Sequence, residues 1–222
     1  MIISCISYKG GVGKTTLSQN LAVCFAHNGY SVCIIDSDET GASTEWKVER
    51  DSQKINPEIP VIPLIKERGY AAAVREIYEK EQYDIILIDS PPSISTIAEK
   101  ILAASHLILM PITPKGGSDL WVTKKLIELY VGFVGDYEKD TPAYFVINQF
   151  NKRVKLHQAY ADVLANYKEK YGIDTLTTKL HDRIAYGEAN AAGMGAYEYS
   201  NPLAKKEVIA MSKEIISIGT NI

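Results

Sequence analysis

The chain has 222 residues and a formal net charge of −3, a length that suits one domain, residues 1–222, better than two. The acidic balance excludes a polycation, so any contact with nucleic acid must come from a local basic patch. No apolar run approaches the ~20 residues that span a bilayer, and residues 1–11 are typical of a first strand rather than a signal peptide.

In chain order, the sequence predicts strands that are apolar on both faces, separated by helices with an apolar stripe. The expected strands are 2–7, 31–38, 83–92, 106–112 and 143–150, with a short extended piece near 174–180. The expected helices are 15–29, 69–82, 94–103, 118–135, 156–171 and 202–217. Residues 39–63 are expected to be irregular because three prolines interrupt them. The alternation predicts the α/β class, a single doubly wound, mostly parallel sheet with helices on both faces, whose ligand site lies at the carboxyl ends of the strands.

The segment "SYKGGVGKTT", residues 7–16, lies between the first strand and the first helix. The phosphate-loop pattern G-x-x-x-x-G-K-[ST] is met by Gly13, Lys14 and Thr15, whereas Tyr8 replaces the first glycine. The glycines let backbone N–H groups face phosphate oxygens, and the helix start adds its positive dipole end. Lys14 is expected to reach the β and γ phosphates, and the Thr15 hydroxyl to hold Mg²⁺. The predicted nucleotide-binding residues are Lys9, Gly10, Gly11, Val12, Gly13, Lys14, Thr15, Thr16 and Asn148.

Lys9 is a second lysine, on the early part of the loop. From there a side chain points more easily at a nucleotide in a facing subunit, where it would act on the charge that develops during phosphoryl transfer. The segment "KGGVGKTT" resembles the deviant Walker A motif of the ParA/MinD ATPases, whose signature lysine matches Lys9. In that family two subunits sandwich two ATP molecules, and each signature lysine crosses to the other site. The resemblance therefore implies a homodimer formed with ATP and catalytic roles for Lys9 and Lys14; a solvated loop lysine is the simpler interpretation of Lys9.

Two predicted strands end in aspartate. "CIIDSD" places Asp36 and Asp38 at the mouth of one strand, and "IILIDSPP" places Asp89 at the end of another. Beside a phosphate loop, an apolar strand that ends in Asp is typical of the Walker B carboxylate, so Asp89 is expected to hold Mg²⁺ together with Thr15; a helix N-cap is the alternative. The family resemblance implies that Asp38 orients or activates the attacking water and that Asp36 supports the metal or the loop. Family members commonly continue D-x-D-P-Q, whereas this chain has D-S-D-E-T, so its response to nucleotide is expected to differ.

Asn148 follows the strand at 143–150 and is the candidate base-reading residue. In the resembling ATPases an Asn after this strand bonds the adenine edge. A guanine site would favour an Asp three residues on, but residue 151 is Asn. The sequence therefore favours ATP over GTP, with a simple turn residue as the alternative interpretation of Asn148.

The resemblance covers nearly the whole chain and is strongest to the short ParA proteins of partition systems. Segments that carry it include "IDSPPS", "LILMPITPKGGSDLWVTKKLIEL" and "DRIAYGEANAAGMGAYEYSNPLAKKEVIAMSKEI". It implies a cytoplasmic, nucleoid-associated ATPase with weak intrinsic activity, stimulated by a ParB-like or other adaptor protein. Its ATP-bound dimer would bind DNA nonspecifically and segregate plasmid or chromosome DNA. Because the chain begins almost at its phosphate-loop strand, no N-terminal helix-turn-helix extension and no operator binding are expected.

Four other functions remain open. ParA-like proteins also position protein assemblies on the nucleoid. A MinD-like membrane regulator should end in a basic amphipathic helix, whereas "KEIISIGTNI" has few basic residues, so no membrane partner is expected. An iron–sulfur carrier needs paired cysteine ligands, but Cys5, Cys24 and Cys33 lie in predicted strands and a helix. An ATP-using biosynthetic ligase would place its substrate near a similar loop.

Contact with DNA would need clustered cations, because the whole chain is acidic. The segment "NKRVK" follows the base-reading strand, and other basic residues lie in the tail that resembles the DNA-contacting end of the family. The candidate DNA-binding residues are Lys152, Arg153, Lys155, Arg183, Lys205 and Lys206. The alternative for each is an ordinary solvated surface charge.

Overall fold

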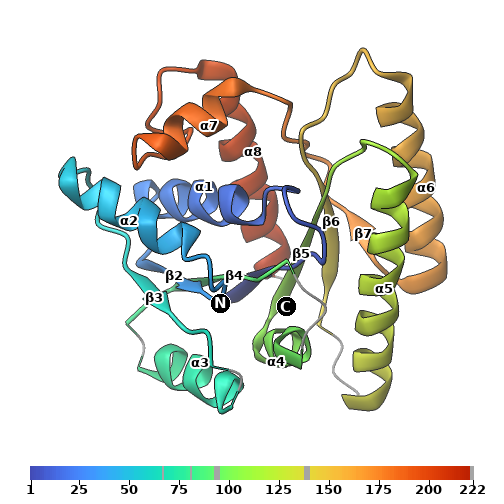
Figure 1. Cartoon of the computed structure of the whole chain (residues 1–222), viewed down its shortest axis with the longest axis horizontal. Helices are drawn as coiled ribbons and strands as arrows, with labels where there is room; N and C mark the ends of the chain where they lie inside the picture. The colour runs from blue at the N-terminus through green and yellow to red at the C-terminus, as the bar shows by residue number, and fades with distance from the viewer. Residues whose placement is uncertain (67, 81, 93–95, 138–140, 221–222) are drawn as a thin grey trace.

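The computed structural model describes residues 1–66, 68–80, 82–92, 96–137 and 141–220. Within these ranges, seven parallel strands form one sheet in the order β3-β2-β4-β1-β5-β6-β7, with helices on both faces (Figure 1). The strands are β1 (Ile2–Cys5), β2 (Val32–Asp36), β3 (Val61–Pro63), β4 (Ile85–Asp89), β5 (Leu107–Ile112), β6 (Ala143–Ile147) and β7 (Asp174–Thr175). The helices are α1 (Lys14–His27), α2 (Ala42–Ser52), α3 (Tyr70–Glu79), α4 (Thr96–Ala104), α5 (Gly117–Tyr137), α6 (Lys155–Tyr171), α7 (Ile184–Ala191) and α8 (Pro202–Gly219). The predicted fold class is confirmed.

Successive side chains of the central strands point to opposite faces of the sheet. Ile3 and Cys5 of β1 pack on the face covered by α1, α2, α7 and α8, whereas Ile2 packs on the opposite face with α3 and α4. The helices α5 and α6 continue that second face over β5 and β6. Because both faces are covered, the strands are apolar throughout rather than alternating with polar residues.

The central position of β1 places the phosphate loop at the middle of the sheet edge. β1 lies between β4 and β5, and β4 in turn pairs with β2. The register sets Cys5 opposite Asp89, and Asp89 opposite Asp36. Parallel pairing therefore brings both strand-end aspartates beside the loop that leaves β1, as expected of a doubly wound sheet.

The prediction that residues 39–63 are irregular is wrong, because α2 occupies Ala42–Ser52. This helix buries Ser43, Trp46 and Arg50, which are spaced along one face. Two of the three are polar and are held by hydrogen bonds, so the helix shows no apolar periodicity. The same region contains β3, a strand at the sheet edge, where a proline is tolerated because one side of the strand needs no N–H donor.

Other boundaries differ by a few residues. The extended piece at 174–180 contains only the two-residue strand β7, and the short helix α7 was not predicted. The start of the helix expected at 94–103 falls on residues 93–95, which lie outside the described ranges, as does residue 81 in the helix expected at 69–82. None of the helices in the described parts of the chain is long and apolar enough to cross a membrane.

Candidate nucleotide site

The phosphate loop turns through glycines in the left-handed region. Gly11 has φ 75° and Gly13 has φ 90°, and Gly13 directly precedes the first residue of α1. A side chain at Gly13 is also blocked by contact, since a Cβ there would lie 2.1 Å from Nδ2 of Asn148. The backbone can therefore curl back above the N-terminus of α1, which is the arrangement that receives anions. Gly10 and Gly11 are exposed and Val12 is buried.

The two lysines of the loop lie in different surroundings. Lys14 is buried, and its Nζ donates to the carbonyl oxygen of Lys9 across 3.3 Å. Burial lowers the pKa of Lys14, and the nearby carboxylates of Asp89 and Asp38 oppose that shift. Lys9 is only half-buried, and its N–H donates to Oγ of Ser7. The structure thus brings Lys14 close to the carboxylates, whereas Lys9 is more exposed than Lys14.

Asp36 and Asp38 are held differently although they are two residues apart. One carboxylate oxygen of Asp36 accepts hydrogen bonds from both the backbone N–H and the hydroxyl of Thr44, at 2.9 and 2.8 Å. The other accepts the N–H of Asp38 at 3.2 Å. Asp38 is half-buried and accepts the N–H of Thr40 at 3.0 Å. Both oxygens of Asp36 are therefore engaged by its own chain at the start of α2, whereas Asp38 is more exposed.

Asp89 is fully buried at the end of β4. Its Oδ2 accepts the hydroxyl of Ser43 at 2.9 Å, whereas its Oδ1 is buried and has no hydrogen-bond partner among the residues that the structure describes. Burial raises the pKa of Asp89 to about 7, against the opposing effect of the Thr15 and Ser43 hydroxyls. An unpaired buried carboxylate oxygen beside a phosphate loop fits the outer coordination of a magnesium ion. The described residues hold no group of three or more His, Cys, Asp or Glu that could hold a metal ion.

Asn148 contacts the phosphate loop. Its Nδ2 donates to the carbonyl oxygen of Val12 at 2.8 Å, and its Oδ1 accepts the N–H of Gln149. Gln149, which has the left-handed φ of 52°, adds a bond from its Nε2 to the carbonyl oxygen of Gly11 at 3.2 Å. The end of β6 thus supports the loop directly, a contribution that sequence reasoning missed for Gln149. The predicted contact between Asn148 and the base stays a prediction.

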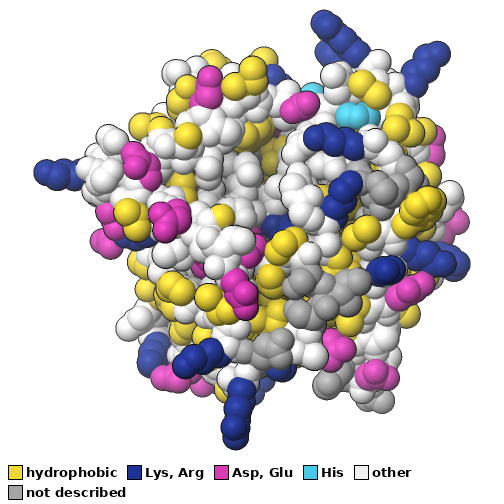
Figure 2. All heavy atoms as spheres, viewed as in Figure 1, with side chains coloured by type: hydrophobic (Ala, Val, Ile, Leu, Met, Phe, Trp, Pro, Cys, Tyr) yellow, Lys and Arg dark blue, Asp and Glu magenta, His cyan; other side chains and the backbone are white. Residues whose placement is uncertain are grey.

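Three segments that hold the predicted DNA-binding residues lie side by side. Phe150 pairs with His181 across a β-bridge, which places the loop before α6 beside the segment before α7. Glu207 of α8 accepts the backbone N–H of His181, so the start of α8 lies there too. Figure 2 shows Lys and Arg side chains gathered at the upper right, where Figure 1 places the loop between β6 and α6.

The candidate cations differ in how strongly the protein holds them. Lys152, Arg153 and Lys155 are exposed, and the first turn of α6 contains no acidic residue. Arg183 instead donates to Glu207 through Nε and Nη2, at 3.0 and 2.6 Å. Lys205 lies with its Nζ 4.0 Å from the ring centre of Tyr197, and Lys206 is exposed. The loop before α6, together with the first residue of that helix, therefore offers the most accessible positive charge of the set.

A buried ion pair ties α2 to the segment between α7 and α8, and sequence reasoning missed it. Arg50 is 1% exposed, and its Nη1 and Nη2 donate to the two carboxylate oxygens of Glu198 at 2.8 and 2.7 Å. Nη1 also donates to the carbonyl oxygen of Gly193. Burial favours a raised pKa for Glu198, but its bonds from Arg50, His27 and Gly195 outweigh burial and hold the pKa below its ordinary value.

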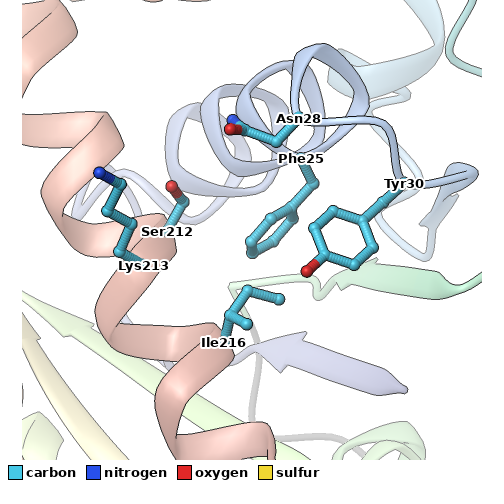
Figure 3. Close-up of a pocket in the computed structure, with 6 residues that line it drawn as sticks. All are labelled: Phe25, Asn28, Tyr30, Ser212, Lys213 and Ile216. Carbon is cyan, nitrogen blue, oxygen red and sulfur yellow. The ribbon is translucent and has the colours of Figure 1, made fainter.

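A separate pocket of about 240 Å³ lies between the C-terminal end of α1 and α8 (Figure 3). Its lining residues are Phe25, Asn28, Tyr30, Ser212, Lys213 and Ile216. The pocket is at the opposite end of α1 from the phosphate loop, and none of the predicted site residues lines it. It is therefore not part of the nucleotide site.

The sheet, the glycine loop before α1 and the buried lysine define a phosphate-loop protein of the α/β class. Residues 3–196 match the family described as the CobQ/CobB/MinD/ParA nucleotide binding domain. The matched region is most of the chain, so the chain belongs to this family of nucleotide-binding proteins. The family predicted from the segment "KGGVGKTT" is confirmed.

Individual relatives cover the chain to different extents. The chain is 26% identical, over 201 residues, to the maintenance of carboxysome distribution protein A of Halothiobacillus neapolitanus, covering 88% of this chain and 86% of that protein. It is 32% identical over 133 residues to the chromosome-partitioning ATPase Soj of Thermus thermophilus, covering 50% of this chain and only 53% of Soj. Its fold is similar to that of the septum site-determining protein MinD of Pyrococcus horikoshii complexed with Mg-ADP, with a TM-score of 0.72 and 20% identity over 98% of this chain and 96% of that chain.

Proposed function

We propose that this protein is a ParA-like ATPase, a switch that dimerises with ATP and binds DNA nonspecifically while it is dimeric. The observation that carries the proposal is the phosphate loop with two lysines: Lys14, which is buried near Asp89, and Lys9, which is only half-buried. Nucleotide binding is supported by the match to a family of nucleotide-binding domains. ATP is the proposed nucleotide and Mg²⁺ the proposed metal, in line with the Mg-ADP bound by the similar MinD structure.

The residues present fit a magnesium nucleotide. Lys14 and the N-terminus of α1 would bind the phosphates, and the hydroxyl of Thr15 would hold Mg²⁺ with the carboxylates of Asp89 and Asp36 outside it. When bound there, Mg²⁺ would neutralise the negative charge of the phosphates. Asp38 would orient a water whose oxygen attacks the γ phosphorus as the bond to the β–γ bridging oxygen breaks, giving ADP and phosphate.

Lys9 supplies the dependence on dimerisation. A lysine that is only half-buried can reach the phosphates of a nucleotide that faces it from a second copy of the chain, where it stabilises the charge of phosphoryl transfer. Lys14 cannot take this part, because it is buried and bonded inside its own loop. The monomer would then hydrolyse ATP only weakly, and hydrolysis in the dimer would cause it to dissociate.

DNA is the proposed surface on which the dimer acts. Lys152, Arg153 and Lys155 offer three accessible charges per subunit, which is too few for firm binding by a monomer at physiological salt. A two-fold dimer doubles the number of phosphates that can be neutralised, without reading any base. A ParB-like or other adaptor protein would stimulate hydrolysis and so release the dimer, in a cytoplasmic, nucleoid-associated cycle that segregates plasmid or chromosome DNA.

Positioning of a protein cargo on DNA is the second candidate. Similarity over 88% of the chain to a carboxysome distribution protein favours it, whereas the higher identity to Soj covers only half of the chain. Both candidates share the ATP-dependent dimer and the DNA surface and differ only in what the adaptor carries.

The test is DNA binding measured by fluorescence anisotropy with a random-sequence duplex, in the presence of ATP, ADP or no nucleotide. We expect affinity only with ATP and Mg²⁺, a steep fall with rising salt, and little preference among duplex sequences. If ATP and Mg²⁺ produce a dimer that does not bind DNA even at low salt, the DNA part of the proposal is wrong and the ATPase part stands.

A further inference from the structure

The first turn of α2 contacts both strand-end carboxylates. Gly41, with φ 65°, precedes the helix and lets the chain turn back toward the sheet edge. Ser43 then donates its hydroxyl to Asp89, and Thr44 donates its N–H and hydroxyl to Asp36. A segment that follows β2 in the chain therefore supports the ends of both β2 and β4.

The Ser43 contact divides the two oxygens of Asp89. Ser43 and Asp89 are both fully buried. Ser43 bonds Oδ2 at 2.9 Å, and within the described ranges Oδ1 has no hydrogen-bond partner. An unpaired buried carboxylate oxygen is costly to keep unless a ligand uses it. One oxygen is thus held by the protein, and the other is left for a group that the protein itself does not supply.

We infer that Ser43 is a positioning residue for Mg²⁺: its hydrogen bond fixes the plane of the Asp89 carboxylate, so that the second oxygen is presented to the metal or its bound water. The inference rests on the proposed function, which gives Asp89 its part in holding Mg²⁺. Ser43 does not touch the metal. It acts as the outer partner of a metal-binding carboxylate, and loss of such a partner typically weakens metal affinity by about 10–100-fold.

The experiment measures Mg²⁺ rather than catalysis. A fluorescent ADP analogue is titrated onto the protein across a range of Mg²⁺ concentrations, with an EDTA baseline. The variants are Ser43→Ala, which deletes the hydroxyl, and Ser43→Cys, which keeps the volume but donates weakly. Ser52→Ala is the matched control, because Ser52 is on the same helix and is exposed, and its hydroxyl donates to the carbonyl oxygen of Glu49.

The parent and Ser52→Ala should show the same Mg²⁺ midpoint for tight ADP binding. Both Ser43 variants should need about tenfold more Mg²⁺ to reach the same ADP affinity. In EDTA, however, they should bind ADP with the affinity of the parent, and their thermal unfolding midpoints should lie within a few degrees of the parental value. An unchanged Mg²⁺ midpoint, or an equal loss of ADP affinity with and without Mg²⁺, would overturn the inference. A parent protein whose ADP affinity ignores Mg²⁺ would instead overturn the proposed metal site, and Ser43 with it.

Discussion

Nζ of Lys14 donates a hydrogen bond to the carbonyl oxygen of Lys9 across 3.3 Å, so the two lysines of the phosphate loop are joined through backbone and side chain. The side chain of one fixes the backbone of the other. Lys14 can pass to phosphate oxygens by exchanging one acceptor for another in the same loop. Since that bond uses the backbone of Lys9, it is compatible with the proposed role of the Lys9 side chain in trans.

Lys14→Ala should abolish nucleotide binding. The substitution removes charge-assisted bonds to the phosphates, and we expect ADP affinity to fall at least about 100-fold. Isothermal titration with Mg-ADP measures it. Lys9→Ala is the matched control in the same loop and should bind ADP within about threefold of the parent. Equal losses in the two variants would show that the lysines share one role, contrary to this account.

Glu198→Gln should destabilise the fold, because it leaves the buried Arg50 without a counter-charge. We expect a loss of about 3 kcal/mol in the free energy of unfolding at pH 7. The pKa of Glu198 is held below its ordinary value of 4.5, so the stability from this carboxylate is present above pH 4.5 and is lost as the pH falls through the folded value. Urea unfolding measured from pH 7 to pH 3 should therefore show the free energies of unfolding of the parent and the variant becoming equal in acid.

Glu76→Gln is the control for this ion pair. Glu76 of α3 and Lys80, which follows that helix, form an exposed pair, and such pairs contribute little. The control should unfold like the parent at every pH. If the difference in free energy of unfolding between Glu198→Gln and the parent stayed constant down to pH 3, the stabilisation could not come from the charge of the Glu198 carboxylate.

Sequence patterns predicted the phosphate loop, the strands that feed it and the two aspartates at the sheet edge, because each depends on local spacing. They did not predict α2, since its buried face is made of Ser43, Trp46 and Arg50 rather than an apolar stripe. The partner of Arg50 lies 148 residues away, a separation that no local pattern records. A signal for Ser43 was present only as "GAST" after the D-x-D segment, a serine and threonine where a helix starts.

Asn148→Ala should weaken nucleotide binding through the loop. The variant loses the bond to the carbonyl oxygen of Val12 and the predicted contact with adenine, so we expect both ATP and GTP affinities to fall, by about 5–10-fold for ATP and by less for GTP. Competition against a fluorescent nucleotide measures both. An equal fall for ATP and GTP would contradict the predicted base contact and leave Asn148 with support of the loop alone.

Charge reversal of the loop before α6 should weaken DNA binding without affecting the ATP-dependent dimer. For Lys152→Glu, Arg153→Glu and Lys155→Glu combined, the slope of log affinity against log salt should become shallower by about 0.9 for each DNA phosphate that the variant no longer neutralises. Lys80→Glu is the control, because it follows the C-terminal end of α3 at the opposite edge of the sheet. If the triple variant binds DNA with the parental slope, the DNA surface lies elsewhere.

The central claim, that Lys9 acts on the nucleotide of the facing subunit, is tested most directly by mixing two inactive variants. Lys9→Ala should lack ATPase activity because it has no lysine to reach the facing site. Asp38→Ala should lack activity because it has no residue to orient the attacking water. A mixed dimer contains one site with its own Asp38 and the Lys9 of its partner. When equal amounts of the two variants are mixed before ATP is added, about half of the dimers should be mixed, and each mixed dimer has one complete site of its two. The mixture should therefore recover up to about a quarter of the parental activity per site. A mixture as inactive as its components, or a Lys9→Ala protein that hydrolyses ATP at the parental rate, would contradict the account.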